Sequence, residues 1–125
     1  MLEPENTFLL VIDIQGNLFL SMDGREELLG NLVRMIQGAA LFDLPIVVTE
    51  QTPEKLGPTI PEIAGLFPSF DPAAKSAFSC CRDEGFKKHL RSLRQKQVLI
   101  TGIESHVCVY QTAADLLRLG YEVHV

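Results

Sequence analysis

The segment Gln97–Gly120 constrains the fold of this chain more than any other segment does. It opens with a short run of apolar and β-branched residues, which is typical of a buried strand, and Gly102 interrupts that run. From Val109 onward, apolar residues recur at the spacing of one helix face, and Gly120 supplies a stop. The segment therefore predicts a strand, a tight turn and an amphipathic helix, with Ser105 as the N-cap of the helix.

Strands and helices alternate along the rest of the chain. Thr7–Ile12 is apolar without alternation, as expected for a strand covered on both faces, and a similar strand follows over residues 46–49. Residues 28–40 and the residues after Asp83 have helical patterns, and residues 121–125 begin a further strand. Residues 50–72 are rich in proline and predict an ordered loop with one short turn at residues 61–66. This order predicts an α/β fold, a doubly wound and mostly parallel sheet with helices on both faces, arranged as a Rossmann-like three-layer sandwich.

The composition fits a single domain over residues 1–125. With 46% hydrophobic residues the chain can form one core, and its net charge of −5 offers no attraction to nucleic acid or to an anionic membrane surface. The apolar run at residues 8–12 is too short to span a bilayer, and the N-terminus lacks a signal-peptide pattern. The three cysteines are an odd number and predict free thiols. We therefore expect a cytoplasmic protein with no nucleic-acid or membrane partner.

The predicted order of elements ends on a strand. A strand with no element after it leaves one face of the sheet without cover. A longer native chain or a partner subunit would supply that cover. Together with apolar residues in the loops, this predicts a homo-oligomer.

Cys108 is the first candidate for a reactive group. The predicted helix places it in the first turn, where unpaired N–H groups and the helix dipole favour negative charge, so its thiol should ionise more easily than a free one. The alternative is a small buried apolar residue, which is the commoner fate of a cysteine. His106 is poorly placed to act as its base, because residues two apart on a helix do not face each other. No Cys or His spacing is typical of zinc, so we expect no metal and no cofactor.

Two further residues lie where chemistry is plausible. Asp13 follows the first strand, at the carboxyl edge where open α/β sheets bind ligands, although a loop aspartate that caps the next element is the alternative. In the common doubly wound order, this strand lies beside the one that ends at Thr101. A carboxylate near a thiol raises the pKa of the thiol, so an active pair needs a cation. Lys75 is the one lysine set among small and apolar residues, although a solvated lysine is the commoner case.

These three residues carry a resemblance to a known family. Asp13 in LLVIDIQ, Lys75 in KSAFS and Cys108 in GIESHVCVYQTA together resemble the isochorismatase-like cysteine hydrolases, in particular an uncharacterised branch related to nicotinamidases. The resemblance implies a mostly parallel sheet and a catalytic triad of these residues. It also implies a cis peptide between Ile103 and Glu104, and an oxyanion hole formed by the N–H groups of Glu104 and Cys108. Family members usually continue further, which implies that the last strand and helix are missing here.

The substrate class follows from where the chain departs from family patterns. Metal-dependent nicotinamidases have an aspartate and histidines after the second strand, whereas this chain has Glu50, Gln51 and Thr52, so we expect neither a metal nor nicotinamide. We predict a hydrolase that acts on a small amide-like molecule through a thioester-type intermediate. Its pocket walls are expected in loops near the carboxyl edge of the sheet, at Phe19, Leu56, Ile60 and Phe78.

Two other functions fit parts of the sequence. A non-catalytic oligomeric scaffold would keep the fold without its chemistry. A phospho-receiver signalling domain has a similar size and an aspartate after its first strand, but it needs clustered acidic groups to bind magnesium, and Asp13 is followed by Ile14 and Gln15.

Overall fold

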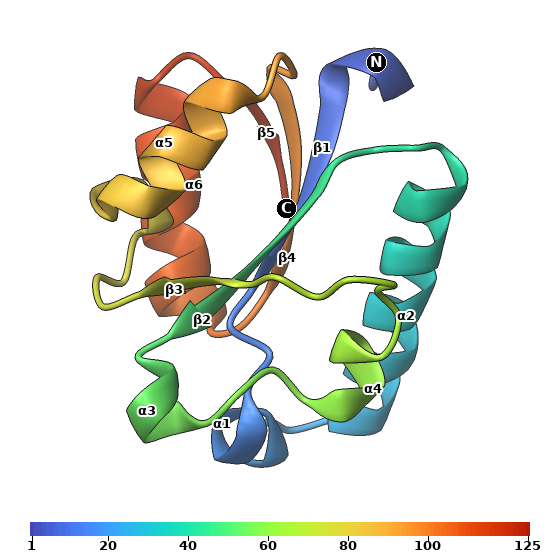
Figure 1. Cartoon of the computed structure of the whole chain (residues 1–125), viewed down its shortest axis with the longest axis vertical. Helices are drawn as coiled ribbons and strands as arrows, with labels where there is room; N and C mark the ends of the chain where they lie inside the picture. Colours follow the sequence, from blue (N-terminus) through green and yellow to red (C-terminus); the bar gives the residue numbers. More distant parts are fainter.

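A five-stranded parallel sheet with the order β3-β2-β1-β4-β5 forms the centre of the protein (Figure 1). The computed structural model describes residues 1–125. The doubly wound parallel α/β fold predicted from the sequence is confirmed. The strands are β1 (Thr7–Ile12), β2 (Ile46–Gln51), β3 (Ala73–Lys75), β4 (Gln97–Gly102) and β5 (Glu122–His124).

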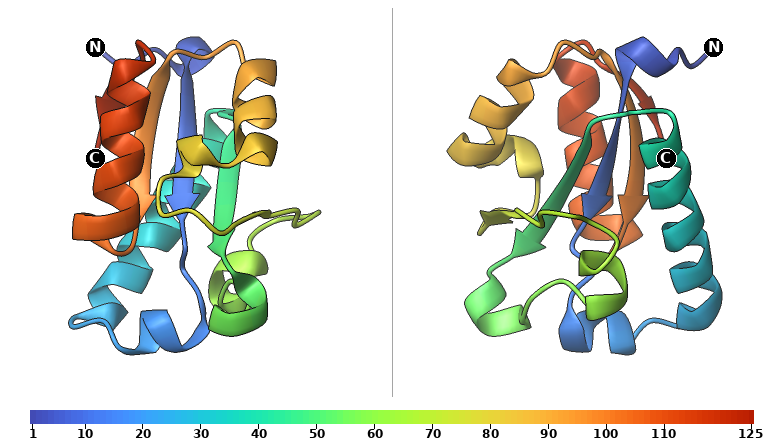
Figure 2. Two further views of the ribbon diagram at one scale, coloured as in Figure 1. Left: turned by 90° about the vertical axis from the view of Figure 1, so that its left-hand side faces the viewer. Right: turned by 45° about the vertical axis from the view of Figure 1, so that its right-hand side comes forward.

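Helices cover both faces of this sheet. In Figures 1 and 2, α2 lies on one face while α5 and α6 lie on the other. Short helices α1, α3 and α4 follow the carboxyl ends of β1 and β2. The helical elements are η1 (Pro4–Asn6), α1 (Gly16–Leu20), α2 (Arg25–Leu41), α3 (Pro53–Leu56), α4 (Pro61–Ala64), η2 (Cys80–Arg82), α5 (Glu84–Ser92), η3 (Ser105–Val109) and α6 (Tyr110–Arg118). No helix is both long and apolar enough to cross a membrane.

The central strand β1 supplies both halves of the core. Phe8, Leu10 and Ile12 pack into a cluster with residues of α5 and α6. Leu9 and Val11 face the other way and pack into a second cluster with residues of α2. Because successive side chains of a strand point to opposite faces, an uninterrupted apolar run is what a strand buried on both faces requires.

The close approach of β1 and β4 brings their carboxyl ends together. Ile12 and Gly102 are register partners at the end of the two strands. A Cβ atom on Gly102 would lie 2.3 Å from the carbonyl oxygen of Ile12, and the backbone has φ +145° there, so only glycine fits. Asp13 and Ile103 therefore leave the sheet at neighbouring points.

The turn after β4 differs from the prediction. Residues Ser105–Val109 form a π-helical turn and α6 begins at Tyr110, so the expected N-cap at Ser105 is wrong. No side chain caps this turn. Instead, the carbonyl of Glu104 accepts hydrogen bonds from the N–H groups of Val107 and Val109, so the backbone itself organises the turn.

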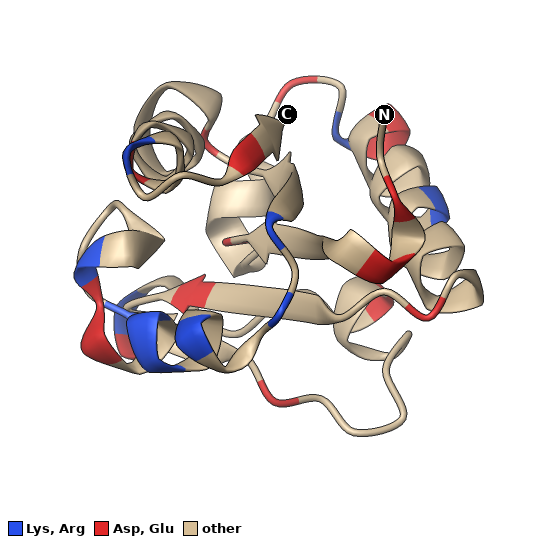
Figure 3. Cartoon of the chain, turned by 90° about the horizontal axis from the view of Figure 1, so that it is seen from above, with Lys and Arg blue, Asp and Glu red and all other residues tan.

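Charged side chains are distributed unevenly over the surface. The helix α5 carries three basic residues, Lys87, Lys88 and Arg91, and one acidic residue, Glu84, while further acidic residues lie on other elements (Figure 3). Phe86 and Leu90 of α5 are buried, as the helical pattern predicted. Asp83 caps this helix by accepting a hydrogen bond from the N–H of Phe86.

Candidate active site

Asp13 is fully buried at the carboxyl edge of the sheet. It follows β1 with φ 57°, a left-handed conformation that aspartate tolerates better than most residues. Its N–H donates to the carbonyl of Thr49 in β2. The Oδ1 atom accepts a hydrogen bond from Thr49 Oγ1 at 2.8 Å, and Oδ2 accepts one from Lys75 Nζ at 3.0 Å. The carboxylate is therefore fixed by neighbouring strands on one side and by a cation on the other.

Lys75 ends β3, and its side chain is 1% exposed. The commoner alternative of a solvated lysine is therefore wrong. Besides Asp13, the ammonium donates to Gln51 Oε1 at 2.6 Å and to the carbonyl oxygens of Ala77 and Phe78, each at 3.2 Å. These oxygen atoms replace the water that a buried ammonium loses. The backbone after β3 curls around the ammonium and supplies two of them.

Cys108 brings a thiol to the same cluster. Its Sγ atom lies 3.7 Å from Lys75 Nζ, and the residue is 7% exposed. Burial raises the pKa of the thiol, the hydrogen bond and charge of Asp13 raise it further, and Lys75 opposes them, which leaves the pKa at about 12. The prediction of an easily ionised thiol is therefore wrong, because burial and the Asp13 carboxylate together raise the pKa of the thiol more than Lys75 lowers it. The thiol is protonated at neutral pH beside a carboxylate.

The other two cysteines are also free and buried. Burial raises the pKa of Cys80 to about 11 and that of Cys81 to about 12. Both belong to the core cluster on the side of α5 and α6 that also contains Cys108. Of the three thiols, only Cys108 has an interaction with Lys75 Nζ within hydrogen-bond range.

Three polar residues around the cluster escaped prediction. Thr49 binds Asp13, Gln51 binds Lys75, and Gln15 binds the backbone of Gln51. All three are buried. The signal that identified Asp13 applied to them too, because each is a polar residue at or just beyond the carboxyl end of an apolar strand.

The backbone near the thiol has an unusual course. The peptide bond between Ile103 and Glu104 is cis. The N–H of Glu104 donates no hydrogen bond within the chain. This donor and the N–H of Cys108 belong to the same turn.

The four residues expected as pocket walls divide into two pairs. Phe19 and Ile60 are buried in the core cluster beneath α2, where they pack against other core side chains. Leu56 and Phe78 are exposed, and the carbonyl of Phe78 accepts from Lys75. All four residues stay predictions as pocket walls.

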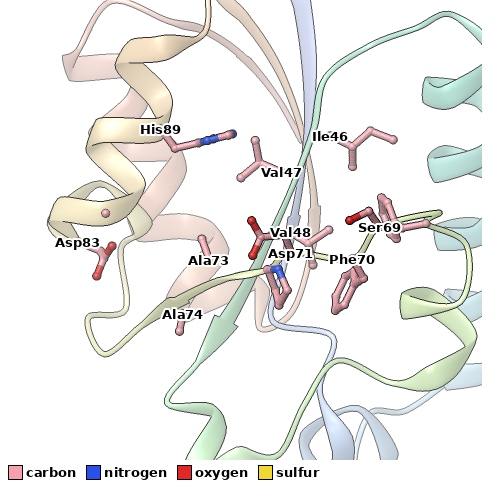
Figure 4. A pocket seen from close by; sticks show the side chains of 13 residues that line it. Ile46, Val47, Val48, Ser69, Phe70, Asp71, Ala73, Ala74, Asp83 and His89 are labelled. Carbon is pink, nitrogen blue, oxygen red and sulfur yellow. The ribbon is translucent and has the colours of Figure 1, made fainter.

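A cavity of about 490 Å³ lies apart from this cluster. Figure 4 shows it between β2, α5 and the segment that leads into β3, with Val47, Asp71 and His89 on different sides. None of Asp13, Lys75 and Cys108 lines it. The buried cluster, and not the cavity, combines a thiol, a carboxylate and an ammonium.

The parallel sheet and the cluster at its carboxyl edge define a doubly wound α/β protein with a candidate cysteine nucleophile. The isochorismatase domain matches residues 7–125, and this chain belongs to the isochorismatase family. This membership does not support the receiver-domain alternative.

Relatives and solved structures agree with this family. The chain is 38% identical to isochorismatase domain-containing protein 2A of Mus musculus over 123 residues, which cover 98% of this chain and 58% of the relative. MAR1 ribonuclease of Caenorhabditis elegans superposes with a TM-score of 0.89 at 34% identity, over 99% of this chain and 64% of the other. This chain thus spans about three fifths of the length of the curated relatives it matches.

Two bacterial YcaC proteins have the same fold. The Escherichia coli protein is an octameric hydrolase of unknown specificity, with a TM-score of 0.88 at 25% identity over 98% of this chain and 62% of the other. The Pseudomonas aeruginosa protein was solved with hexane-2,5-diol and covalent acrylamide, and has a TM-score of 0.89 at 26% identity over the same shares.

Proposed function

We propose that this domain is a cysteine hydrolase that cleaves a small amide-like substrate, with Cys108 as nucleophile, Asp13 as general base and Lys75 as the cation that stabilises the ionised pair. One observation carries the proposal. A single ammonium, Lys75 Nζ, lies 3.0 Å from the Asp13 carboxylate and 3.7 Å from the Cys108 sulfur, and the side chains of Lys75 and Asp13 are almost fully buried.

The reaction begins with a proton transfer. Asp13 takes the proton of the Cys108 thiol, and the thiolate attacks the carbonyl carbon of the substrate, which forms a C–S bond and moves an electron pair onto the carbonyl oxygen. The N–H groups of Glu104 and Cys108 bind this oxyanion. Asp13 then gives the proton to the leaving nitrogen as the C–N bond breaks, which leaves a thioester.

Water completes the cycle. Asp13 takes a proton from a water molecule, whose oxygen attacks the thioester carbon and displaces the Cys108 sulfur. The sulfur recovers its proton, and the product is a carboxylic acid. Lys75 keeps its positive charge beside both groups throughout, so negative charge is stabilised whether it lies on the carboxylate or on the sulfur.

The raised pKa of Cys108 fits this scheme. A thiol with a pKa of about 12 is protonated at neutral pH, so it needs a base in contact before it can attack. Asp13 is that base. The scheme therefore depends on transfer to a neighbouring carboxylate, and not on a thiolate that exists beforehand.

The relatives support the proposal in part. One bacterial relative is described as a hydrolase, and another was solved with covalent acrylamide. The octameric relative also supports the proposal that this chain forms homo-oligomers. Another relative is named a ribonuclease, but a net charge of −5 gives an RNA backbone no attraction here, so we favour a small uncharged substrate.

Asp13→Asn separates the proposed base from a merely structural residue. Release of ammonia from a panel of small amides should fall by about 100-fold, because the base is lost. Alkylation of Cys108 by iodoacetamide should become faster, because the carboxylate that raises the pKa of the thiol is gone. A loss of fold would instead expose all three cysteines to alkylation.

Cys108→Ala tests the nucleophile. It should abolish ammonia release, while Cys80→Ala retains it. Amide hydrolysis that persists in Cys108→Ala would refute the proposal. Failure of every amide to react with the wild type would favour the non-catalytic scaffold.

A further inference from the structure

We infer that Gln51 is a positioning residue for the Lys75 ammonium, and that Gln15 holds Gln51 in the orientation this requires. The inference rests on the proposed function, in which the charge of Lys75 must stay beside the sulfur of Cys108. Gln51 lies at the end of β2 and Gln15 lies two residues after Asp13. Both glutamines are buried.

The contacts of Gln51 fix both ends of its amide. Its Oε1 atom accepts from Lys75 Nζ at 2.6 Å, the shortest of the contacts that the ammonium makes. Its Nε2 atom donates to the carbonyl of Ser76 at 2.9 Å. Because an oxygen faces the ammonium and a nitrogen faces the next carbonyl, the amide cannot turn over without losing both hydrogen bonds. Gln51 thus binds the Lys75 side chain and the backbone that follows it.

Gln15 holds the backbone of Gln51 much as a neighbouring strand would. Its Oε1 atom accepts from the N–H of Gln51 at 2.7 Å, and its Nε2 atom donates to the carbonyl of Gln51 at 3.1 Å. The same Nε2 atom donates to the carbonyl of Gly57 at 2.7 Å. These three hydrogen bonds connect the loop after β1 to the end of β2 and to the residue that follows α3.

The neutrality of Gln51 matters for the charge balance around the sulfur. The titratable groups that face Cys108 are Asp13 after β1, Lys75 at the end of β3 and Cys80 in η2. A second carboxylate at position 51 would offset the positive charge of Lys75 and so favour the protonated thiol. The amide oxygen of Gln51 is neutral, so it binds the ammonium without offsetting the positive charge of Lys75. That charge continues to act on Asp13 and Cys108.

Alkylation of the native protein by iodoacetamide measures this charge balance. The rate of alkylation at Cys108 is followed by peptide mass spectrometry at pH values below the pKa of the thiol. In that range the rate is proportional to the fraction of Cys108 present as thiolate. Gln51→Glu should slow the alkylation of Cys108 about tenfold at each pH, because one added negative charge raises the pKa of the thiol by about one unit. Gln51→Met keeps the length of the side chain but removes the acceptor, and should slow alkylation by a smaller factor.

Gln97→Glu is the matched control. It makes the same substitution at another buried glutamine, at the amino end of β4, and should leave the alkylation rate of Cys108 unchanged. If it slows alkylation as much as Gln51→Glu does, the effect of an added carboxylate is not specific to position 51 and the inference is wrong.

Lys75→Met separates failure of the inference from failure of the proposed function. A rate that falls in Lys75→Met but not in Gln51→Glu would overturn the role of Gln51 alone. A rate that is unchanged in Lys75→Met would overturn the coupling of the ammonium to the thiol, and the proposed function with it. Slower alkylation in both variants, with Gln97→Glu unchanged, is the expected result.

Discussion

The two ends of the central strands β1 and β4 both bury polar side chains, but they do so in different ways. At the amino end, the amide of Gln97 uses every hydrogen-bonding position. Its Oε1 atom accepts from the N–H of Glu3 at 2.8 Å and from Thr7 Oγ1 at 3.1 Å. Its Nε2 atom donates to the carbonyl of Met1 and to Glu122 Oε2, both at 2.9 Å. This network joins the N-terminus to β4 and β5 and contains no nucleophile.

At the carboxyl end, the buried network contains formal charges. Asp13 and Lys75 form an ion pair that is 0% and 1% exposed, and the Cys108 sulfur lies beside it. No buried side-chain nitrogen or oxygen in the chain lacks a hydrogen-bond partner, so both ends are equally well satisfied. Hydrogen-bond satisfaction therefore does not distinguish the amino-end network from the candidate active site. The difference lies in a buried charge pair, whose desolvation is costly and seldom favoured for stability alone.

Lys75→Met should have the largest effect on stability. It removes the cation and leaves the buried carboxylate of Asp13 without its ionic partner, which should lower the free energy of unfolding by about 3–5 kcal/mol. Urea denaturation followed by circular dichroism measures the loss. The double variant Asp13→Asn/Lys75→Met should recover much of it, because no unpaired charge remains. A double variant less stable than Lys75→Met would contradict this account.

Gln97→Leu should have a smaller effect that is confined to stability. It leaves the N–H of Glu3 without its acceptor, while the hydroxyl of Thr7 can still donate to the carbonyl of Glu3, at a cost of about 1–3 kcal/mol in the free energy of unfolding. The same urea titration measures it. Alkylation of Cys108 in the folded variant should match the wild type, and a marked change in that rate would show that the two ends of the sheet are coupled.

Alkaline pH should destabilise the carboxyl end through its thiols. The pKa of Cys108 is raised from its ordinary value of 9.0 to about 12 in the folded protein. The unfolded state therefore loses its proton first, so the stabilisation is fully present below pH 9.0 and is lost as the pH rises through about 12. Cys108→Ser should reduce the alkaline decline in unfolding free energy by up to about 1.4 kcal/mol per pH unit in that window. Identical declines in the wild type and the variant would contradict the raised pKa.

The smallest expected effect concerns Glu122 at the amino end. A hydrogen bond from Gln97 and a second from His124 hold the pKa of Glu122 below its ordinary 4.5. The stabilisation from this carboxylate is present above pH 4.5 and is lost as the pH falls through its lowered pKa. Gln97→Leu should return the pKa towards its ordinary value in an NMR titration of the carboxyl group. Glu84, whose pKa is lowered by Lys87, is the internal control and should not move.

Patterns confined to a few neighbouring residues predicted most of the fold. The apolar run of β1 and the spacing of Phe86 and Leu90 in α5 depend on local periodicity, which is visible in the sequence. The strand β3 was missed because Ala73–Lys75 is only three residues long and pairs with β2 across a long loop. The π-helical turn before α6 was missed because it replaces a side-chain cap with backbone hydrogen bonds.

The candidate site divides in a similar way. The positions of Asp13 and Cys108 beside two neighbouring strands could be predicted, because parallel strands of a doubly wound sheet end at one edge. The small and apolar neighbours of Lys75 in the sequence show only that it does not lie on a typical solvated helix face. Its burial was first suggested by the resemblance to a family. The contacts of Gln15, Gln51 and Thr49 could not be predicted, since they join residues far apart in the chain.

The sequence by itself determined the parallel architecture, the edge of the sheet at which polar groups collect, and the three residues that could react. Tertiary structure alone decided their electrostatics. The pKa of a thiol depends on how much water reaches it and on which charges lie within a few ångströms, and these distances are set by packing. For that reason the thiol predicted to ionise easily is instead held protonated beside a carboxylate, with one buried ammonium in contact with both groups.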